Sequence, residues 1–453
     1  MVTFNTGDKG SEVEPKTIIA GDTVARPEED PTRRDGYVFG GWFSNETYEM
    51  PYNFDTPVTG PLTIYAKWND FSEISKILSY LNATYGGYSV YNPVALKLDF
   101  NLSGNNADDL TDYENNLLGL LVAIDTAGKY VELDLSECTM NGTAFGSGLK
   151  SSEYFSKGKD KIVSLTLPDS AITIEEGSLD FPTFKYFTAL QRVSGEKIKY
   201  IKKFAFTDCY ALEEANFPET TTIGEKTFQR TALKEAIFPD VETIENYAFQ
   251  YAALKKADLG SESAHETDIG IGVFHDCTAL EEVKIPNVKI IEVETFYNCR
   301  ALKEVDLESA TTIGIGAFKY CDALETVKSS SVKIINTEAF YGCRALKEAD
   351  FSGVTTIDDY VFEACGALGI VKIPNVIKIG NSIFRDTGST ELVITLNEFP
   401  TLTSTTGLFP LVNIPKTVTV MVPSSALDGT NASGWPLSFK GSNDNIKLEI
   451  KSL

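Results

Sequence analysis

The stretch Ile291-Glu-Val-Glu-Thr-Phe296-Tyr-Asn-Cys299-Arg-Ala-Leu302 recurs along much of this chain of 453 residues. It returns as Ile313, Phe318, Cys321 and Leu324, and again as Ile335, Phe340, Cys343 and Leu346. The full set of recurring phenylalanines is Phe206, Phe228, Phe249, Phe274, Phe296, Phe318, Phe340, Phe362 and Phe384, and each has an isoleucine five residues before it. Most steps are 22 residues, with one of 21 and one of 25. Such a period indicates a solenoid, in which each repeat forms one coil and buries its apolar residues against its neighbours.

After each Ala-Leu pair comes a second pattern, in which apolar and polar residues alternate. It reads Leu280-Glu-Glu-Val283-Lys-Ile285, Leu302-Lys-Glu-Val305-Asp-Leu307 and Leu346-Lys-Glu-Ala349-Asp-Phe351. This is Leu-x-x-Leu-x-Leu in substituted form, which is typical of the strand of a leucine-rich repeat. The apolar members are expected to point into the coil and the polar ones onto the open face of the sheet. The predicted fold class is therefore mainly β, a leucine-rich repeat solenoid of parallel strands with coils of about 22 residues.

Six of the seven cysteines occupy one repeat position, namely Cys209, Cys277, Cys299, Cys321, Cys343 and Cys365. Stacked coils place such residues about 5 Å apart, a spacing that a disulfide tolerates. Coils without cysteine have Thr231 or Ala252 near this position, which indicates a small buried residue. Buried free thiols are our first interpretation and cross-coil disulfides the second, so cysteine usage does not fix the redox compartment.

The composition restricts the classes of partner. The net charge of −24 argues against nucleic acid and anionic membrane surfaces, because phosphate recognition needs clustered Lys and Arg. No apolar run approaches the roughly 20 residues of a membrane-spanning helix. The residues Met1-Val-Thr-Phe4 lack a signal-peptide pattern and lead directly into strand-like sequence, so we expect that an export signal has been removed.

Residues 1–69 have the pattern of a small β module. Strand-like segments alternate with turn signals, and Thr63 to Trp68 alternates as a half-buried strand does. Trp42 and Trp68 are the expected core anchors. Through its Gly36-Tyr37-Val38-Phe39-Gly40-Gly41-Trp42 run, the module resembles the Listeria–Bacteroides repeat, also called the internalin B-repeat, a β-grasp-like module of bacterial surface proteins. The resemblance implies an extracellular spacer or binding module and no chemistry of its own.

Residues 70–160 are predicted to form an α/β cap over the first open coil. The segment 70–83 has helical apolar spacing with Asp70 as a candidate N-cap, and Thr111-Asp-Tyr-Glu114 is a capping box before a second helix. Strand-like runs at 95–100 and 131–135 follow the two helices. An acidic cluster lies near the second helix, formed by Asn105, Asn106, Asp108, Asp109, Asp112 and Glu114. It lacks the EF-hand spacing and glycine, so a solvated loop with a helix cap is the first interpretation and a calcium site the second.

The repeats run from about 161 to 395, interrupted by the insertion 260–266, and residues 396–453 are predicted to form a closing β cap. Pro423 ends a strand there, and Trp435 and Phe439 are expected to cover the last coil. The two repeat patterns together resemble the BspA-like (Treponema pallidum-type) leucine-rich repeat family of surface proteins. The tail, with Val418-Thr-Val-Met-Val422-Pro423, is similar to the ending of Bacteroides members of that family.

Charged residues on the predicted sheet face alternate in sign. One column contains Asp258, Lys284, Asp306, Lys328, Asp350 and Lys372, and a second contains Glu281, Lys303, Glu325 and Lys347. Neighbours in such a column lie about 4.8 Å apart, so unlike charges support one another. The first interpretation is a self-neutralised face that fixes the register. The second is a polar recognition platform, because solenoids bind through extended surfaces.

Aromatic residues follow each repeat phenylalanine and are expected on nearly the same edge of the solenoid. They are Tyr251, His275, Tyr297, Tyr320 and Tyr341. Tyrosine is enriched at interfaces because it is amphipathic. These residues either shield the edge of the coils or contact a ligand. We therefore take all five, with Lys284, Asp306, Lys328 and Asp350 of the sheet face, as candidate ligand contacts.

Signals for catalysis or cofactors are weak. The two histidines, His265 and His275, have no further residues spaced to complete a metal site. There is no nucleophile-elbow motif for a Ser-His-Asp enzyme. Glu304 and Glu348 lie two coils apart, about 10 Å, beyond the usual separation of glycosidase carboxylates. We predict no catalytic, metal or cofactor site, and burial disfavours cysteine nucleophiles.

The family resemblance implies a non-enzymatic, secreted or cell-surface protein. Its expected partner is a protein of a host or neighbouring cell, such as an extracellular-matrix component, without nucleic acid and without membrane insertion. One alternative is a carbohydrate-binding surface component whose tyrosines stack on sugar rings. Further alternatives are a passive spacer with no ligand of its own and a hydrolase.

Overall fold

The computed structural model describes residues 1–33, 37–99, 101–102, 117–146, 149, 156–260, 266–387, 391–398, 400–402, 417–423 and 447–452. The chain divides into two compact units, and each is treated by itself. The first unit comprises residues 1–143, 151–171 and 186–195, and the second comprises residues 144–150, 172–185 and 196–453.

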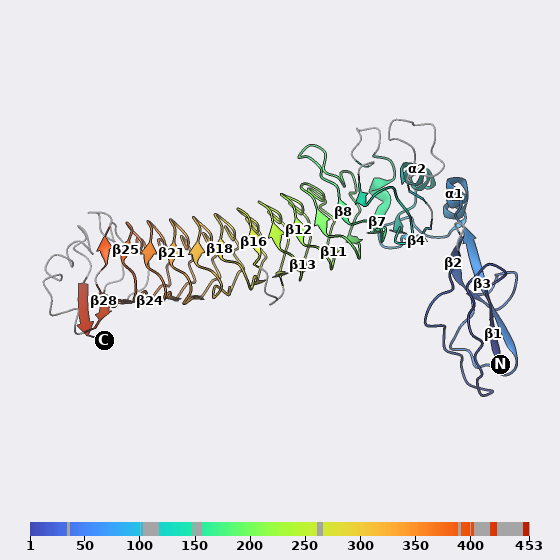
Figure 1. Cartoon of the computed structure of the whole chain (residues 1–453), viewed down its shortest axis with the longest axis horizontal. Helices are drawn as coiled ribbons and strands as arrows, with labels where there is room; N and C mark the ends of the chain where they lie inside the picture. Colours follow the sequence, from blue (N-terminus) through green and yellow to red (C-terminus); the bar gives the residue numbers. More distant parts are fainter. Residues whose placement is uncertain are drawn as a thin grey trace. The chain divides into compact units, whose positions relative to one another are not determined.

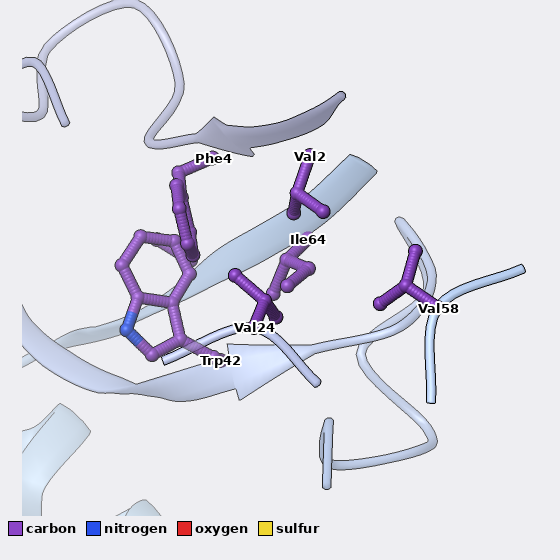
Figure 2. Packing of buried hydrophobic residues seen from close by; sticks show 7 residues of the cluster. Val2, Phe4, Val24, Trp42, Val58 and Ile64 are labelled. Atoms are coloured by element: carbon purple, nitrogen blue, oxygen red, sulfur yellow. The ribbon is translucent and has the colours of Figure 1, made fainter. Parts of the chain in front are cut away.

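A three-stranded sheet with the order β1-β3-β2 organises the start of the first unit. Its strands are β1 (Val2–Asn5), β2 (Tyr37–Phe43) and β3 (Leu62–Asp70). β1 is parallel to β3, and β2 is antiparallel to it. Figure 2 shows the core of this module, where the Phe4 ring meets Trp42 edge to face at 5.1 Å between centroids. Trp42 is buried and Trp68 is packed at the border of the core, so both predicted anchors are confirmed.

Two α-helices, one short 3-10 helix and four parallel strands complete the first unit. They are α1 (Ile74–Ala83), β4 (Val94–Lys97), α2 (Leu117–Ala127), β5 (Val131–Asp134), the short 3-10 helix η3 (Lys159–Lys161), β7 (Ile162–Thr166) and β9 (Arg192–Ser194). β4, β5, β7 and β9 pair in that order within one parallel sheet. The strand stacking that is typical of the repeats therefore already occurs among residues 94–194.

The first helix begins later than predicted. α1 starts at Ile74, after Glu73, and Asp70 ends β3 instead of capping the helix. Burial alone would raise the pKa of Asp70, but hydrogen bonds from Ser72 and Lys76 outweigh it and lower that pKa to about 2. The carboxylate thus serves the turn between β3 and α1. Phe100, the predicted capping box at 111–114 and the acidic cluster at 105–114 lie outside the described residues.

The coils of the second unit follow one another in a row, as Figure 1 shows for β12, β16, β18, β21 and β25. A column of two-residue strands, the isoleucine ladder, holds the repeat isoleucines in two parallel sheets of six strands. The first sheet contains β6 (Ala144–Phe145), β8 (Thr173–Ile174), β10 (Tyr200–Ile201), β12 (Thr222–Ile223), β14 (Thr243–Ile244) and β16 (Asp268–Ile269). The second contains β18 (Ile290–Ile291), β19 (Thr312–Ile313), β21 (Ile334–Ile335), β23 (Thr356–Ile357), β25 (Lys378–Ile379) and β27 (Thr401–Leu402).

A second column of strands, which belong to more than one sheet, carries the alternating charges, and we name its outer side the strand face. Its strands are β11 (Glu214–Asn216), β13 (Glu235–Phe238), β15 (Lys256–Leu259), β17 (Glu282–Lys284), β20 (Thr326–Lys328), β22 (Glu348–Asp350), β24 (Ile370–Lys372), β26 (Glu391–Thr395), β28 (Thr417–Val422) and β29 (Lys447–Ser452). Along β17 and β20 the middle residue is buried and its neighbours are exposed, as predicted. β28 ends just before Pro423, also as predicted, whereas Trp435 and Phe439 lie outside the described residues.

One predicted strand is wrong. Residues 302–307 carry the same alternating pattern as their neighbours, yet these described residues are not in a strand, and the sheet is interrupted between β17 and β20. The Asp306 side chain accepts a hydrogen bond from the Glu308 backbone N–H at 2.9 Å. Such a local bond offers the backbone an alternative to ladder pairing.

The repeat phenylalanines stack as a continuous ladder inside the coils. From Phe184 to Phe384, neighbouring ring centroids are 4.5–5.9 Å apart and their planes lie within 13° of each other. All of these rings are buried. The predicted solenoid with internal columns of isoleucine and phenylalanine is therefore confirmed.

The cysteines are buried free thiols, in agreement with our first interpretation. The structure adds a bonding role, because each repeat thiol donates a hydrogen bond to the phenylalanine carbonyl of the preceding coil. Cys321 Sγ, for example, lies 3.2 Å from Phe296 O, and Cys343 Sγ lies 3.1 Å from Phe318 O. Burial raises the pKa of Cys209 and of Cys365 to about 12. These thiols are accordingly neutral and inert.

Candidate binding surfaces

The structure brings the five predicted aromatic residues together in one row, which we name the aromatic edge. The His275 ring stacks on Tyr297 with 4.5 Å between centroids and lies 6.3 Å from Tyr251. Tyr297 meets Tyr320 edge to face at 5.7 Å, and Tyr320 meets Tyr341 in the same way at 5.5 Å. The expected placement on one edge is confirmed, and a ligand for these residues stays a prediction.

An unusual backbone turn places these side chains. In every coil from Phe206 to Phe384, the second residue before and the second residue after the phenylalanine have a left-handed φ between 52° and 71°. Tyr251 and Tyr320 occupy the later of these two positions, with φ of 59° and 63°. Their backbone N–H groups donate to the next coil, at 3.0 Å to His275 O and 2.9 Å to Tyr341 O. Neighbouring members of the aromatic edge are thereby fixed to one another by the main chain.

Most of the aromatic edge is half-buried. Tyr251 is 48% exposed, whereas only 15% of the His275 side chain is exposed. His275 Nδ1 lies 2.8 Å from Asp276 Oδ2 without the alignment of a hydrogen bond. Burial is the main cause that raises the pKa of Tyr251, Tyr297 and Tyr341. These three tyrosines are therefore neutral side chains at physiological pH.

A partly buried cation lies beside the aromatic edge, and sequence reasoning missed it. Lys319 Nζ lies 4.5 Å from the centroid of the Tyr341 ring and 5.5 Å from that of Tyr320. The same ammonium pairs with Glu338 at 2.7 Å, and its side chain is only 19% exposed. Lys319 follows Phe318 directly, so the repeat offset was the signal that could have assigned it to this edge.

The strand face shows ion pairs between successive coils at some of the predicted positions. Lys303 pairs with Glu281 at 2.5 Å, and Lys347 pairs with Glu325 at 2.8 Å. In the other column Lys284 lies 3.8 Å from Asp258, and Lys372 lies 3.4 Å from Asp350. Each such pair is solvent-exposed, so its contribution to stability is small.

The ion pairing of this column is incomplete in the middle of the solenoid. Within the described part of the chain, no ion pair joins Asp306 to Lys284 or Lys328, and none joins Lys328 to Asp350. The two missing pairs of Asp306 fall at the coil 302–307, where the strand is absent and Asp306 accepts a hydrogen bond from Glu308 instead. Lys328 and Asp350 are register partners in β20 and β22, and Asp350 pairs with Lys372. Lys284, Asp306, Lys328 and Asp350 therefore do not form one continuous charged column.

The residues that the structure describes give little evidence for a metal site or for catalysis. Those residues contain no cluster of three or more His, Cys, Asp or Glu side chains that could hold a metal ion. His265 lies outside the described residues, so the pair His265 and His275 is not tested. The helices that the structure describes are all too short or too polar to cross a membrane.

Two families match the sequence. The BspA-type leucine-rich repeat region matches residues 150–265 and 267–391, which together exceed half of the chain. The Listeria–Bacteroides repeat domain matches residues 1–67. No curated protein matches the chain.

Several solved structures are similar over parts of the chain. A leucine-rich repeat protein from Bacteroides ovatus is 21% identical with a TM-score of 0.34, over 64% of this chain and 84% of that one. The leucine-rich repeat protein of T. pallidum is 26% identical with a TM-score of 0.30, over 34% and 75%. A leucine-rich cell surface protein from Faecalibacterium prausnitzii is 20% identical with a TM-score of 0.34, over 62% and 83%.

These structural scores are low, so family membership rests on the sequence matches and on the repeat geometry described above. Both matches fall where the repeat pattern and the small β module were recognised. The chain therefore belongs to the BspA-type leucine-rich repeat family and begins with a Listeria–Bacteroides repeat domain.

Proposed function

We propose that this protein is a non-enzymatic surface or secreted adhesin that binds a partner protein along its aromatic edge. The observation that carries the proposal is the unbroken row of five aromatic side chains across successive coils, from Tyr251 to Tyr341. Tyrosines held in fixed positions lose little entropy on binding and are enriched where interfaces concentrate their energy. The partner is a protein of a host or neighbouring cell. Residues 1–69 serve as a surface module, and residues 70–160 and 396–453 cap the repeats at 161–395.

The packing of the rings favours a protein partner over a glycan at this edge. A sugar ring stacks on a free aromatic face, but the faces of His275 and Tyr297 cover each other at 4.5 Å. Tyr320 is placed edge-on between two other tyrosines. The edge therefore presents ring rims and hydroxyl groups, which suit the mixed polar and apolar surface of a protein.

The charges beside the aromatic edge restrict the kind of partner that it can bind. Lys319 is neutralised by Glu338, and Arg385 is paired with the buried Glu363 at the end of the same column. The edge thus offers no free cation for an acidic partner among these residues. An interface of this kind gains affinity from ring contacts and little from long-range attraction.

The test measures binding of the full chain to a panel of purified extracellular-matrix proteins by biolayer interferometry, with a glycan array in parallel. The variant Tyr297→Ala/Tyr320→Ala/Tyr341→Ala is expected to weaken capture at least tenfold, since central interface tyrosines often contribute about 2 kcal/mol each. The matched control Lys303→Ala/Lys347→Ala on the strand face is expected to change binding less than about threefold.

Folding of the variants is checked by thermal unfolding, and Tyr297→Phe/Tyr320→Phe/Tyr341→Phe keeps the packing while it removes the hydroxyl groups. Equal capture by the wild type and the alanine variant would dismiss the aromatic edge. Loss of binding in the control instead would assign recognition to the strand face. A wild-type chain that captures no protein of the panel would leave the passive spacer as the better account.

A further inference from the structure

The loop between α1 and β4, residues 84–93, carries three tyrosines that point into solvent. Tyr85, Tyr88 and Tyr91 are 96%, 72% and 92% exposed. No tyrosine of the aromatic edge is exposed to this degree, and the three exposed rings come from one loop of ten residues instead of being scattered singly. This loop, which we name the tyrosine loop, belongs to the first unit and is separate from the aromatic edge.

A buried lysine holds the tyrosine loop in place. Lys129 is 3% exposed, and its ammonium donates to Gly86 O at 2.6 Å and Thr84 O at 3.1 Å. The same ammonium lies 3.5 Å from the centroid of the Tyr88 ring, which covers it. A charge buried in this way requires partners in fixed positions. The loop is therefore anchored from beneath by a side chain that is not accessible to a ligand.

The main chain of the loop is also fixed. Gly87 N–H donates to Asn92 O at 2.7 Å, and Gly87 O accepts from Tyr130 N–H at 2.7 Å. Gly87 has a φ of +73°, and a Cβ there would lie 2.8 Å from Val94 Cγ2 and 3.0 Å from Lys129 Cδ. Only glycine fits this position. The three tyrosines are thus presented on a closed and preorganised loop, which lowers the entropy cost of binding.

The chemistry of the loop points to an uncharged partner. Residues 84–93 contain no Asp, Glu, Lys or Arg, although 23% of the whole chain is charged. Tyr85 and Tyr91 have free ring faces and hydroxyl groups, and Ser89 and Asn92 add further polar groups beside them. A neutral sugar has the matching character, because one face of a pyranose ring presents C–H groups and its rim presents hydroxyl groups.

The size of the loop separates a sugar from a protein. Three tyrosines bury about 600 Å² at most, on the order of 200 Å² each, whereas a stable protein interface needs roughly 800 Å² from each partner. A few sugar units need far less. We propose that the tyrosine loop is a binding site for neutral saccharide chains, with Tyr85 and Tyr91 as the stacking platforms and Tyr88 as the lid on Lys129.

The experiment is affinity electrophoresis of the full chain in native gels that contain neutral polysaccharides, namely β-glucan, xyloglucan, galactomannan or mannan. At least one of them is expected to retard the wild-type chain. The variant Tyr85→Ala/Tyr91→Ala is expected to weaken that retardation about tenfold or more, since both stacking rings are lost. It leaves Tyr88 and Lys129 intact, so the loop keeps its anchor.

Two further variants sharpen the result. Tyr200→Ala/Tyr210→Ala removes two exposed tyrosines from the solenoid and is expected to keep full retardation. Gly87→Ala keeps all three tyrosines but distorts the loop, and it is expected to lose retardation while the thermal unfolding of the repeats is unchanged. Retardation that is equal in the wild type and Tyr85→Ala/Tyr91→Ala overturns the proposal, and so does a wild-type chain that none of the polysaccharides retards. Loss of matrix-protein capture in that variant without polysaccharide binding would assign the loop to a protein.

Discussion

The inside and the outside of the coils obey opposite rules. Inside, the same side chain returns in every coil, so that Phe296, Phe318 and Phe340 stack ring on ring at 5.2 and 5.1 Å. Outside, the side chain changes sign from one coil to the next, so that Glu325 meets Lys347. Apolar side chains gain by stacking with their like, whereas equal charges repel. The comparison teaches that the repeat restricts the size of the side chain strictly inside the coils and the sign of its charge only loosely outside them.

The largest expected effect concerns the thiols of the interior at alkaline pH. The pKa of Cys209 and Cys365 is about 12 in the folded chain, against about 8.5 for an unfolded thiol. Because the folded value is the higher one, this stability is complete below about pH 8.5 and is lost as the pH rises toward about 12. Within this pH range each buried thiol lowers the free energy of unfolding by about 1.4 kcal/mol per pH unit. The six repeat thiols together therefore lower it by more than any single substitution described below. Urea unfolding between pH 7 and 10.5 measures this loss.

Other groups also titrate in this pH range, so a variant in which three neighbouring cysteines are replaced serves as the control. The variant Cys299→Ala/Cys321→Ala/Cys343→Ala is expected to be less stable at pH 7 but to show a shallower loss of stability with rising pH. An unchanged slope would mean that the cysteines do not cause the alkaline sensitivity.

The next effect breaks the phenylalanine ladder. Phe318→Ala removes a fully buried ring between two neighbours and is expected to cost about 3–5 kcal/mol. Because coils contact only adjacent coils, hydrogen exchange is expected to speed up near residues 296–340 and to change little in residues 1–70. Tyr320→Ala, two residues away on the outside, is the matched control with a smaller cost. A uniform rise in exchange over the whole chain would contradict the local character of the ladder.

The smallest effect reverses one charge of the strand face. Lys347 and Glu325 are 2.8 Å apart with side chains 60% and 59% exposed, so Lys347→Glu is expected to cost only about 0.2–1 kcal/mol. The loss should shrink in 1 M salt, because salt screens the repulsion between exposed like charges that are free to move apart. Unfolding midpoints at low and high salt test this, with Lys347→Gln as the control. A cost that persists in high salt would show that the lysine contributes packing.

The interior of the repeats could be predicted because the same spacing of isoleucine, phenylalanine and cysteine recurs from coil to coil. Once the spacing of Ile313, Phe318 and Cys321 is known, identical neighbouring coils leave no other place for these side chains. The two positions after each repeat phenylalanine predicted the aromatic edge from Tyr251 to Tyr341. Lys319 was missed because the rings come from two adjacent offsets, and only the geometry shows that both converge.

Two features could not be predicted, since they depend on contacts between coils. Tyr320 and Glu294 adopt a left-handed backbone that few non-glycine residues favour, and hydrogen bonds from their N–H groups to the next coil hold it. The glycines at 272, 316 and 342, with Asp or Asn at 208, 276, 298 and 386, were the hints of these turns. The missing strand at 302–307 has the same pattern as its neighbours, so its local bond at Asp306 could not be foreseen.

The alternation of ion pairs along the strand face has a consequence for how such a chain can change its length. The pairs Glu281–Lys303 and Glu325–Lys347 show that the unit of charge balance is two coils, while the unit of apolar packing is one. A chain that gains or loses two coils at a time preserves both the apolar packing inside the coils and the alternation of charge outside them. One that gains a single coil keeps its interior but sets two like charges side by side, as Lys234 and Lys255 already do after the Ala-Leu pairs of two consecutive coils. Because exposed charges contribute little to stability, an odd number of added coils is expected to cost an ion pair and to leave the fold intact.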